Sequence, residues 1–226
     1  MSSKPIGSPP RRILRGLTFA LVTIVFAIVL SAFVARLYEI PSSSMETTLH
    51  GCSGCDNDRV LVDRLSYRFS GPAPGDVVVF SRPRSWTNAE LALPDTRNPL
   101  VRGLSSIGAL VGVQRADEAD MIKRVIAIGG QTVSCCDARN RVMVDGRSID
   151  EPFVYFAPEF GPARQGTFDP VRVPEGQIWV MGDNRNNSVD SRAPNDGPVP
   201  LEDVIGKARL IVLPFARFGR IDGNQH

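Results

Sequence analysis

The hydrophobic pattern divides this chain of 226 residues into one long apolar run and a series of short ones. The long run, residues 17–35 (LTFALVTIVFAIVLSAFVA), carries no charge. As a helix it would span about 28 Å, close to the roughly 30 Å hydrocarbon core of a bilayer. Residues 1–16 contain basic residues and no acid, which favours a cytoplasmic N-terminus. The pattern therefore predicts a short cytoplasmic tail and one uncleaved transmembrane anchor.

Two other interpretations of this run fit the sequence less well than an anchor. A cleaved signal peptide would have a shorter apolar core, about 7–15 residues, and a small-x-small exit, whereas the exit here is FVARLYEI. A core helix of a globular domain is rarely apolar on every face. Beyond Arg36 the best further candidate, residues 208–218, is short and contains Pro214. We therefore expect a single-pass protein of the plasma membrane, with its large C-terminal part outside the cytoplasm.

Short runs rich in Val and Ile, bounded by Gly, Pro, Asn and Asp, follow the anchor and are typical of strands. They are residues 58–69, 75–80, 121–133, 140–149, 176–183 and 207–213. The 140–149 run contains Asp145-Gly146, which suits a type I′ hairpin turn. We therefore predict an all-β, mainly antiparallel domain of barrel or sandwich type over residues 36–226, with loop insertions at 81–119 and 152–175.

Charge and cysteine usage narrow the class of function. The formal net charge is only +2, which gives no electrostatic support for binding nucleic acid. The four cysteines form a C-x-x-C pair, Cys52 and Cys55, and an adjacent pair, Cys135 and Cys136. An adjacent pair reaches one zinc ion only awkwardly, so no metal or other cofactor is expected. Outside the cell we expect a disulfide within 52–55 or one joining the two regions; spacing does not choose between them, and free thiols stay an alternative.

The stretch PSSSM at residues 41–45 contains three serines, and a serine becomes a strong nucleophile only beside a base. The two histidines are His50, in the same loop, and the terminal His226; neither is promising for a Ser-His-Asp arrangement. Arginine keeps its proton at usable pH. One of the three lysines precedes the anchor, so elimination leaves Lys123 and Lys207 as candidate bases.

Lys123 lies in the predicted strand DMIKRVIAI, among apolar neighbours. Burial there would lower the pKa of its amine from about 10.4 and make it a competent base near neutral pH. The ordinary alternative is a lysine on the solvated face of a half-exposed strand. Lys207 precedes a terminal strand and has no accompanying motif.

Four sequence blocks, in this order and after an anchor, resemble the type I signal peptidases. They are PSSSMETTL (41–49), GDVVVF (75–80), KRVIAIGGQTV (123–133) and MGDNRNNSVDSR (181–192). The resemblance extends from about Leu17 to Gly219 and is most similar to the single-anchor actinobacterial forms. It implies a serine endopeptidase with a Ser-Lys dyad that removes signal peptides from exported preproteins after a small-x-small motif.

The resemblance also implies roles for individual residues. Ser44, directly before a methionine, corresponds to the nucleophile, and Lys123 corresponds to the general base. Ser42 corresponds to a hydroxyl of the oxyanion hole and Ser188 to the side chain that orients the lysine, whereas Ser43 falls at a variable position and has no implied role. Supporting positions are the ion pair of Asp190 and Arg192 and the pocket residues Ile40, Met45, Leu49 and Ile122, for which plain core packing is the alternative.

The expected partners follow from the same resemblance. A secretory preprotein would bind extended alongside the strands of Ile40 and Ile122, and the lipid bilayer and the export translocon are further expected partners. Two departures from the family pattern are Thr47, where proline is usual, and Asn186, where an acid is usual. The APNDGPVP continuation after Arg192 also differs. None of these changes removes a reacting group.

Three other functions fit parts of the pattern. A self-cleaving repressor also uses serine and lysine on a related β core, but the anchor and the lack of a DNA-binding region argue against it. An inactive anchored β-domain would leave Lys123 exposed, with an ordinary pKa. A thiol oxidoreductase would use Cys52 and Cys55, but its C-x-x-C normally opens a helix in a βαβ unit.

Overall fold

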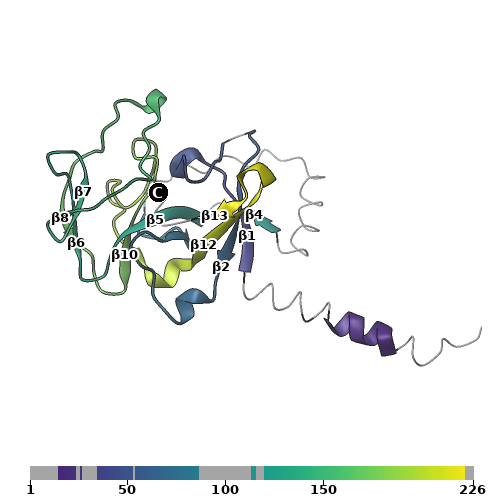
Figure 1. Ribbon diagram of the computed structural model, residues 1–226. Helices are drawn as coiled ribbons and strands as arrows, with labels where there is room; N and C mark the ends of the chain where they lie inside the picture. The colour runs from purple at the N-terminus through teal and green to yellow at the C-terminus, as the bar shows by residue number, and fades with distance from the viewer. Residues whose placement is uncertain are drawn as a thin grey trace, which may run out of the picture.

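The computed structural model describes most of the predicted extracytoplasmic part of the chain. The described residues are 15–23, 26, 35–52, 54–86, 113–115 and 120–221. Residues 15–23 are helical and lie apart from the β-sheets (Figure 1), with Leu17, Phe19 and Leu21 exposed. Most of the predicted anchor lies outside the described residues, and no helix within them is both long and apolar enough to cross a membrane.

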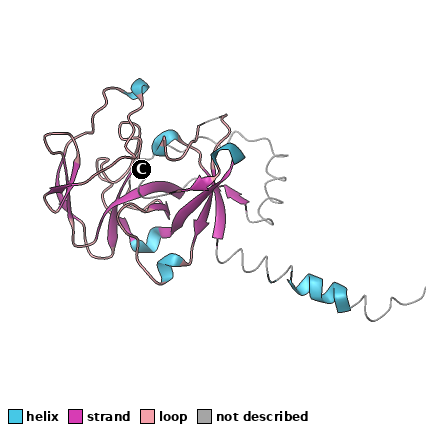
Figure 2. Ribbon diagram, in the orientation of Figure 1, coloured by secondary structure: helices cyan, strands magenta, loops and turns pink. Residues whose placement is uncertain are grey.

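The regular structure in the rest of the described chain consists of strands and short 3-10 turns joined by loops, so the prediction of a mainly antiparallel β domain is confirmed (Figure 2). The larger sheet has the order β11-β10-β5-β3-β12-β2-β1-β4, with β13 paired to β12. Its strands are β1 (Ala35–Glu39), β2 (Arg59–Asp63), β3 (Val77–Ser81), β4 (Val113–Arg115), β5 (Asp120–Ile128), β10 (Gln177–Met181), β11 (Val199–Pro200), β12 (Val204–Leu213) and β13 (Gly219–Arg220). All described pairs in this sheet are antiparallel except β1 with β4.

A smaller sheet has the order β8-β7-β6-β9. Its strands are β6 (Thr132–Cys135), β7 (Val142–Val144), β8 (Arg147–Ser148) and β9 (Phe168–Arg172). The predicted hairpin is confirmed as β7 and β8, because both turn residues, Asp145 and Gly146, have positive φ as a type I′ turn requires. The 3-10 turns are η1 (Ser43–Met45), η2 (Ser66–Arg68), η3 (Pro158–Phe160), η4 (Leu201–Asp203) and η5 (Phe215–Arg217).

Several predicted boundaries were wrong, for local reasons. The expected strand 58–69 ends at Asp63, because its carboxylate accepts hydrogen bonds from the backbone N–H groups of Leu65 and Ser66 and turns the chain. The expected strand 121–133 is two strands, since a turn with Gly130 at positive φ separates β5 from β6. Strand β9 lies in the predicted 152–175 loop, and most of the predicted 81–119 insertion lies outside the described residues.

Strand β5, which carries the candidate base Lys123, is an internal strand of the larger sheet. It lies between β10 and β3, and six consecutive residues, 122–127, are buried. Its register with β3 pairs Val79 with Ile122 and Val78 with Lys123. Apolar clusters on the two sides of the sheet therefore enclose the backbone around Lys123.

Both cysteine pairs form local disulfides. Cys52 bonds to Cys55 in the loop after η1, and Cys135 bonds to Cys136 at the end of β6. No disulfide joins the two regions among the described residues, so the alternative of a long-range bridge is not what the fold adopts.

Gly206 in β12 lies where β2 leaves no room for a side chain. A Cβ there would be 2.5 Å from the carbonyl oxygen of Asp63 and 2.9 Å from Cγ1 of Val62. We expect Gly206→Ala to lower the free energy of unfolding by about 1–3 kcal/mol, because the strands must move apart. Chemical denaturation of the detergent-solubilised chain measures this change. Gly71→Ala, which meets no atom within 4 Å, is the matched control, and equal stability of the two variants would contradict the prediction.

Candidate active site

Ser44 and Lys123, 79 residues apart in the chain, meet in the structure. The Lys123 Nζ donates a hydrogen bond to Ser44 Oγ at 2.8 Å and another to the Ile122 carbonyl oxygen at 2.9 Å. Ser44 lies in η1 and is 8% exposed, while Lys123 lies on β5 and is 3% exposed. An amine and a hydroxyl at this distance, largely closed off from water, can exchange a proton.

The environment of Lys123 favours the neutral amine. Burial disfavours the ammonium form and lowers the pKa of Lys123 to about 8, although the negative charges of Asp190 and Asp183 act in the opposite direction. Because this pKa is well below the usual value, a substantial fraction of the amine is neutral at mildly alkaline pH. The alternative of a solvated lysine on a half-exposed strand is therefore wrong.

Ser42 lies beside the same reacting oxygen. Its Oγ is 3.2 Å from Ser44 Oγ, and either hydroxyl could be the donor. Ser42 precedes η1 in an extended conformation, which leaves its half-buried side chain next to the Ser44 turn. A hydroxyl in this place can donate to an oxygen that bonds near Ser44.

Asp190 is the hydrogen-bond centre of the loop that contains Ser188. Its carboxylate accepts from Ser188 Oγ at 2.7 Å and from the Gly182 N–H at 2.8 Å, and forms an ion pair with Arg192 at 2.7 Å. Burial by itself would raise the pKa of Asp190, but the charge and hydrogen bonds of Arg192 lower it below its usual range. Asp190 is therefore a carboxylate that fixes this loop.

Ser188 lies close to the reacting pair, but its hydrogen bond goes elsewhere. A Cβ at Gly182 would collide with Ser188 Oγ and lie 2.5 Å from the carbonyl oxygen of Ser44. Gly182 therefore permits the close approach of the two segments. Within the described structure Ser188 donates to Asp190, and its hydroxyl has no hydrogen bond with Lys123.

A buried ion pair fixes the segment after Ser44. Arg124 donates to both carboxylate oxygens of Asp183, at 2.9 and 2.7 Å, and neither side chain is exposed. Thr48 Oγ1 donates to the same carboxylate at 2.7 Å. These bonds join β5, the loop that follows β10 and the loop that follows η1, so they fix the position of Lys123 relative to Ser44. Sequence reasoning missed this network, although Asp183 and Arg124 both lie in the blocks that it singled out.

The four predicted pocket residues are all buried in one apolar cluster. Ile40, Met45, Leu49 and Ile122 are 7% exposed or less and pack with Tyr38, Val60 and Val62. This arrangement is also what ordinary core packing would produce, and their role as pocket residues stays a prediction.

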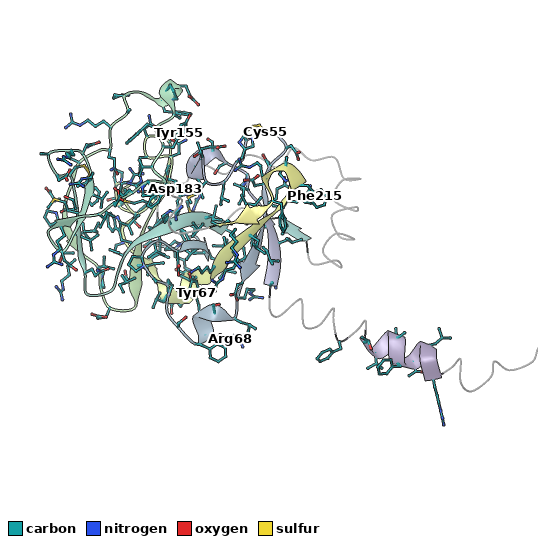
Figure 3. The ribbon with its side chains drawn as sticks, viewed as in Figure 1. Cys55, Tyr67, Arg68, Tyr155, Asp183 and Phe215 are labelled. Carbon is teal, nitrogen blue, oxygen red and sulfur yellow. A yellow bond between two sulfur atoms is a disulfide. The ribbon has the colours of Figure 1, made fainter. Side chains whose placement is uncertain are left out.

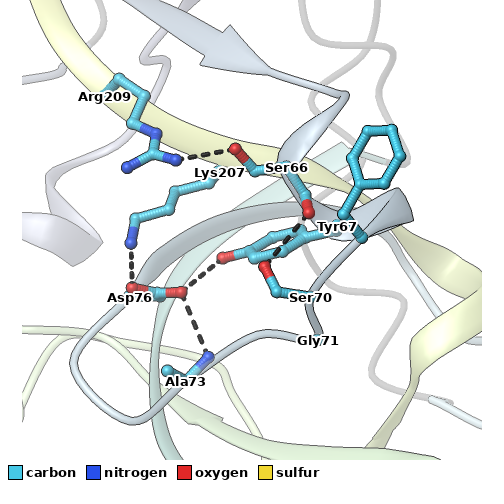
Figure 4. Close-up of a pocket in the computed structure, with 9 residues that line it drawn as sticks. Ser66, Tyr67, Ser70, Gly71, Ala73, Asp76, Lys207 and Arg209 are labelled. Atoms are coloured by element: carbon cyan, nitrogen blue, oxygen red, sulfur yellow. Dashed lines mark hydrogen bonds and ion pairs between the residues drawn. The ribbon is translucent and has the colours of Figure 1, made fainter.

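The other candidate bases are engaged elsewhere. His50 Nδ1 is 2.5 Å from the Glu46 carboxylate. Lys207 forms an ion pair with Asp76 in a separate pocket of about 450 Å³ that Tyr67 also lines (Figure 4). Neither Ser44 nor Lys123 lines that pocket. His226 lies outside the described residues.

Ser43, for which the pattern predicted no role, is hydrogen-bonded to the loop that follows β10. Asn187 Nδ2 donates to Ser43 Oγ at 2.8 Å, and Asn184 Nδ2 donates to the Ser43 carbonyl oxygen at 3.0 Å. The Asn184 N–H donates to the carbonyl oxygen of Ser44 at 3.1 Å. Both asparagines belong to the GDNRNNS stretch, but their partners could not be found from spacing because they lie more than 100 residues away.

Comparison with known proteins gives a consistent result. The family model described as "Signal peptidase, peptidase S26" matches residues 13–213. A signal peptidase I of Mycobacterium tuberculosis (strain H37Rv) is 47% identical over 214 residues, covering 88% of this chain and 72% of the relative. A protein of Mycobacterium leprae (strain TN) named "Probable signal peptidase I" is 44% identical over 225 residues, covering 89% and 76%. A signal peptidase I of Leptolyngbya laminosa is 30% identical over 222 residues, covering 97% and 90%.

The Ser43 contact gives a prediction for the geometry of the site. We expect Ser43→Ala to lower kcat/KM for a cleavable peptide about 3- to 10-fold, because the turn with Ser44 loses one hydrogen bond worth about 1 kcal/mol. Initial-rate kinetics measure this loss. Ser70→Ala, an exposed serine bonded to the Ser66 carbonyl oxygen, should keep the wild-type rate. A Ser43→Ala rate equal to that of this control would show that the Asn187 contact does not position Ser44.

Proposed function

Because the chain belongs to the signal peptidase family, peptidase S26, and is an enzyme of the signal peptidase I type, we propose that Ser44 and Lys123 carry its reaction. Ser44 is the nucleophile and Lys123 the general base in the removal of signal peptides from exported preproteins. The observation that supports this assignment is the 2.8 Å contact between the two side chains, with the amine buried.

The first step is acylation of Ser44. The neutral amine of Lys123 accepts the proton of the Ser44 hydroxyl while the oxygen attacks the scissile carbonyl. The negative charge that develops on the carbonyl oxygen is stabilised by the Ser42 hydroxyl and the backbone N–H of Ser44. Each such donor contributes about 3–4 kcal/mol to stabilising the transition state.

The second half of the reaction returns the proton. The Lys123 ammonium donates its proton to the leaving amine, which departs as the new N-terminus of the mature protein. The amine, neutral again, removes a proton from a water that attacks the Ser44 ester, and then donates this proton to Ser44 Oγ as the acyl group leaves. Asp190 supports the cycle from a distance, because its negative charge partly offsets the burial cost of the ammonium intermediate. Ser188 fixes the orientation of that carboxylate.

Substrate choice would follow from the apolar cluster beside Ser44. The proposed substrate places two small residues, in a small-x-small motif, against Ile40, Met45, Leu49 and Ile122. The support for this is that the four side chains belong to one apolar cluster and that Met45 directly follows Ser44 in η1. The cleavage segment would bind in an extended conformation along the backbone near Ile40 and Ile122.

Location follows from the apolar run before β1. We propose that residues 1–16 form a cytoplasmic tail, 17–35 the membrane anchor and 36–226 the extracytoplasmic catalytic domain. The uncharged run and the exposed apolar side chains of helix 15–23 support this arrangement. Ser44 follows residue 35 by nine residues, which reach about 30 Å at most. The site would therefore be held near the bilayer, where signal peptides emerge from the export translocon.

Cleavage of a preprotein with an Ala-x-Ala site tests the assignment. We expect the detergent-solubilised wild type to cleave it and Ser44→Ala and Lys123→Arg to lose activity by at least about 1,000-fold, since arginine cannot act as a base. Gel analysis and N-terminal sequencing of the product measure this. Lys207→Arg is the matched control, because it keeps a cation for Asp76 and should keep its activity. Cleavage by Lys123→Arg at the wild-type rate would rule out the proposed base.

The pKa of Lys123 sets the expected pH dependence. A base acts in its deprotonated form, so kcat/KM should rise with pH and level off above a midpoint near the value of about 8. Initial rates between about pH 6 and pH 10 on a peptide without titratable side chains measure this profile. A kcat/KM that does not change across this range would contradict the role of Lys123.

A further inference from the structure

The segment 151–165, which lies in the predicted 152–175 insertion except for its first residue, is joined to the loop that contacts Ser44. The Tyr155 N–H donates to the Asp183 carbonyl oxygen, and the Arg185 N–H donates to the Tyr155 carbonyl oxygen, each at 2.8 Å. Figure 3 shows Tyr155 and Asp183 on the same part of the molecule. The segment thus runs beside residues 183–186 like an added strand, with a β-bridge between Tyr155 and Asn184.

Asn186 completes this attachment with its side chain. Its Oδ1 accepts from the Ala157 N–H at 2.9 Å, and its Nδ2 donates to the Ala157 carbonyl oxygen at 3.0 Å. Only an amide satisfies both backbone groups, because a carboxylate has no proton to donate. The asparagine that departs from the usual acid of the family is therefore matched to this segment.

Arg185 fixes both ends of the segment. Its guanidinium is 3% exposed and donates to Glu151 and to Gln165, each at 2.6 Å. A third bond, from Nε, reaches the Gly182 carbonyl oxygen at 2.9 Å. A segment held at its ends by a buried cation and in its middle by Asn186 has a fixed position relative to Ser44.

The segment and the proposed signal-peptide pockets are connected to Ser44 through different residues. Those pockets involve Ile40 and Ile122, which pack with β2. In Figure 1, β1 and β2 lie to the right, and the green segment 151–165 lies to the left. The loop to which this segment is bonded, which follows β10, contacts Ser43 and Ser44 directly through Asn184. A polypeptide with its scissile bond at Ser44 would therefore lie close to the loop to which the segment is bonded.

We infer that segment 151–165 binds the first residues of the mature protein, beyond the scissile bond, and that Asn186 is its positioning residue. The segment offers aromatic side chains: Tyr155 and Phe156 are half-buried, and Phe160, at the end of η3, is 51% exposed. The matching ligand is an apolar side chain shortly after the cleavage site. This inference rests on the proposed function, because it assigns a further part of the same substrate.

Two preprotein series, identical up to an Ala-x-Ala site, test the inference with the full-length detergent-solubilised chain. One series carries Leu or Phe in the first three mature positions, and the other carries Ser or Asn. Wild type should cleave the apolar series with a KM about tenfold lower. Asn186→Asp should raise the KM for the apolar series to that of the polar series and leave kcat within about twofold. Asn195→Asp, an exposed asparagine with the same change of charge, should behave as wild type.

Phe160→Ser provides a second test that does not depend on the folding of the Asn186 variant. It should also remove the preference for the apolar series, because it takes away an exposed aromatic ring. Equal KM values of the wild type for both series would overturn the inference. The proposed function would still hold in that case if the wild type cleaves both series and Ser44→Ala cleaves neither. A fall in kcat for both series with Asn186→Asp would also overturn it. Failure of wild type to cleave either series would instead contradict the proposed function.

Discussion

Burial of the Lys123 amine at hydrogen-bonding distance from Ser44 is the constraint on which the site depends. A buried ammonium loses its hydration, and this cost lowers the pKa of the amine to about 8. The enclosure requires a central strand, and β5 meets that requirement because β10 and β3 flank it and apolar clusters cover it. The same lysine at an edge strand would be solvated and would keep an ordinary pKa. The sheet thus determines the pKa of Lys123 as well as its position.

A second constraint is that η1 must stay in contact with β5. Two sets of bonds maintain this contact, Arg124 and Thr48 on Asp183 and Asn184 and Asn187 on Ser43, while Asp190 fixes the connecting loop through the Gly182 N–H. All of them involve the loop that follows β10. Because these groups are mostly buried, removing one partner would leave another unsatisfied, which costs more than the bond itself contributes. The loop that follows β10 therefore holds η1 in contact with β5.

Much of the fold could be predicted from local patterns, and the errors have local causes. Short runs rich in Val and Ile, bounded by Gly, Pro, Asn and Asp, predicted the strands at 75–80, 176–183 and 207–213, and Asp145-Gly146 predicted the hairpin turn. Strand β9 was missed because its sequence, FDPVR, contains a proline and an acid that are uncommon in strands. The proposed pair of Ser44 and Lys123 could be predicted for a different reason: because the chain has few lysines and histidines, elimination left few candidate bases.

The sequence by itself determined the residue types and the order of the blocks. An uncharged run, a serine before methionine and a lysine among apolar residues are visible in the linear chain, because they depend only on composition and spacing. Only the tertiary structure decided that Lys123 contacts Ser44, that Ser188 donates to Asp190 and that Asn186 binds Ala157. The physical reason is that hydrogen bonds and burial depend on distances in space, and strand pairing brings together residues far apart in the chain.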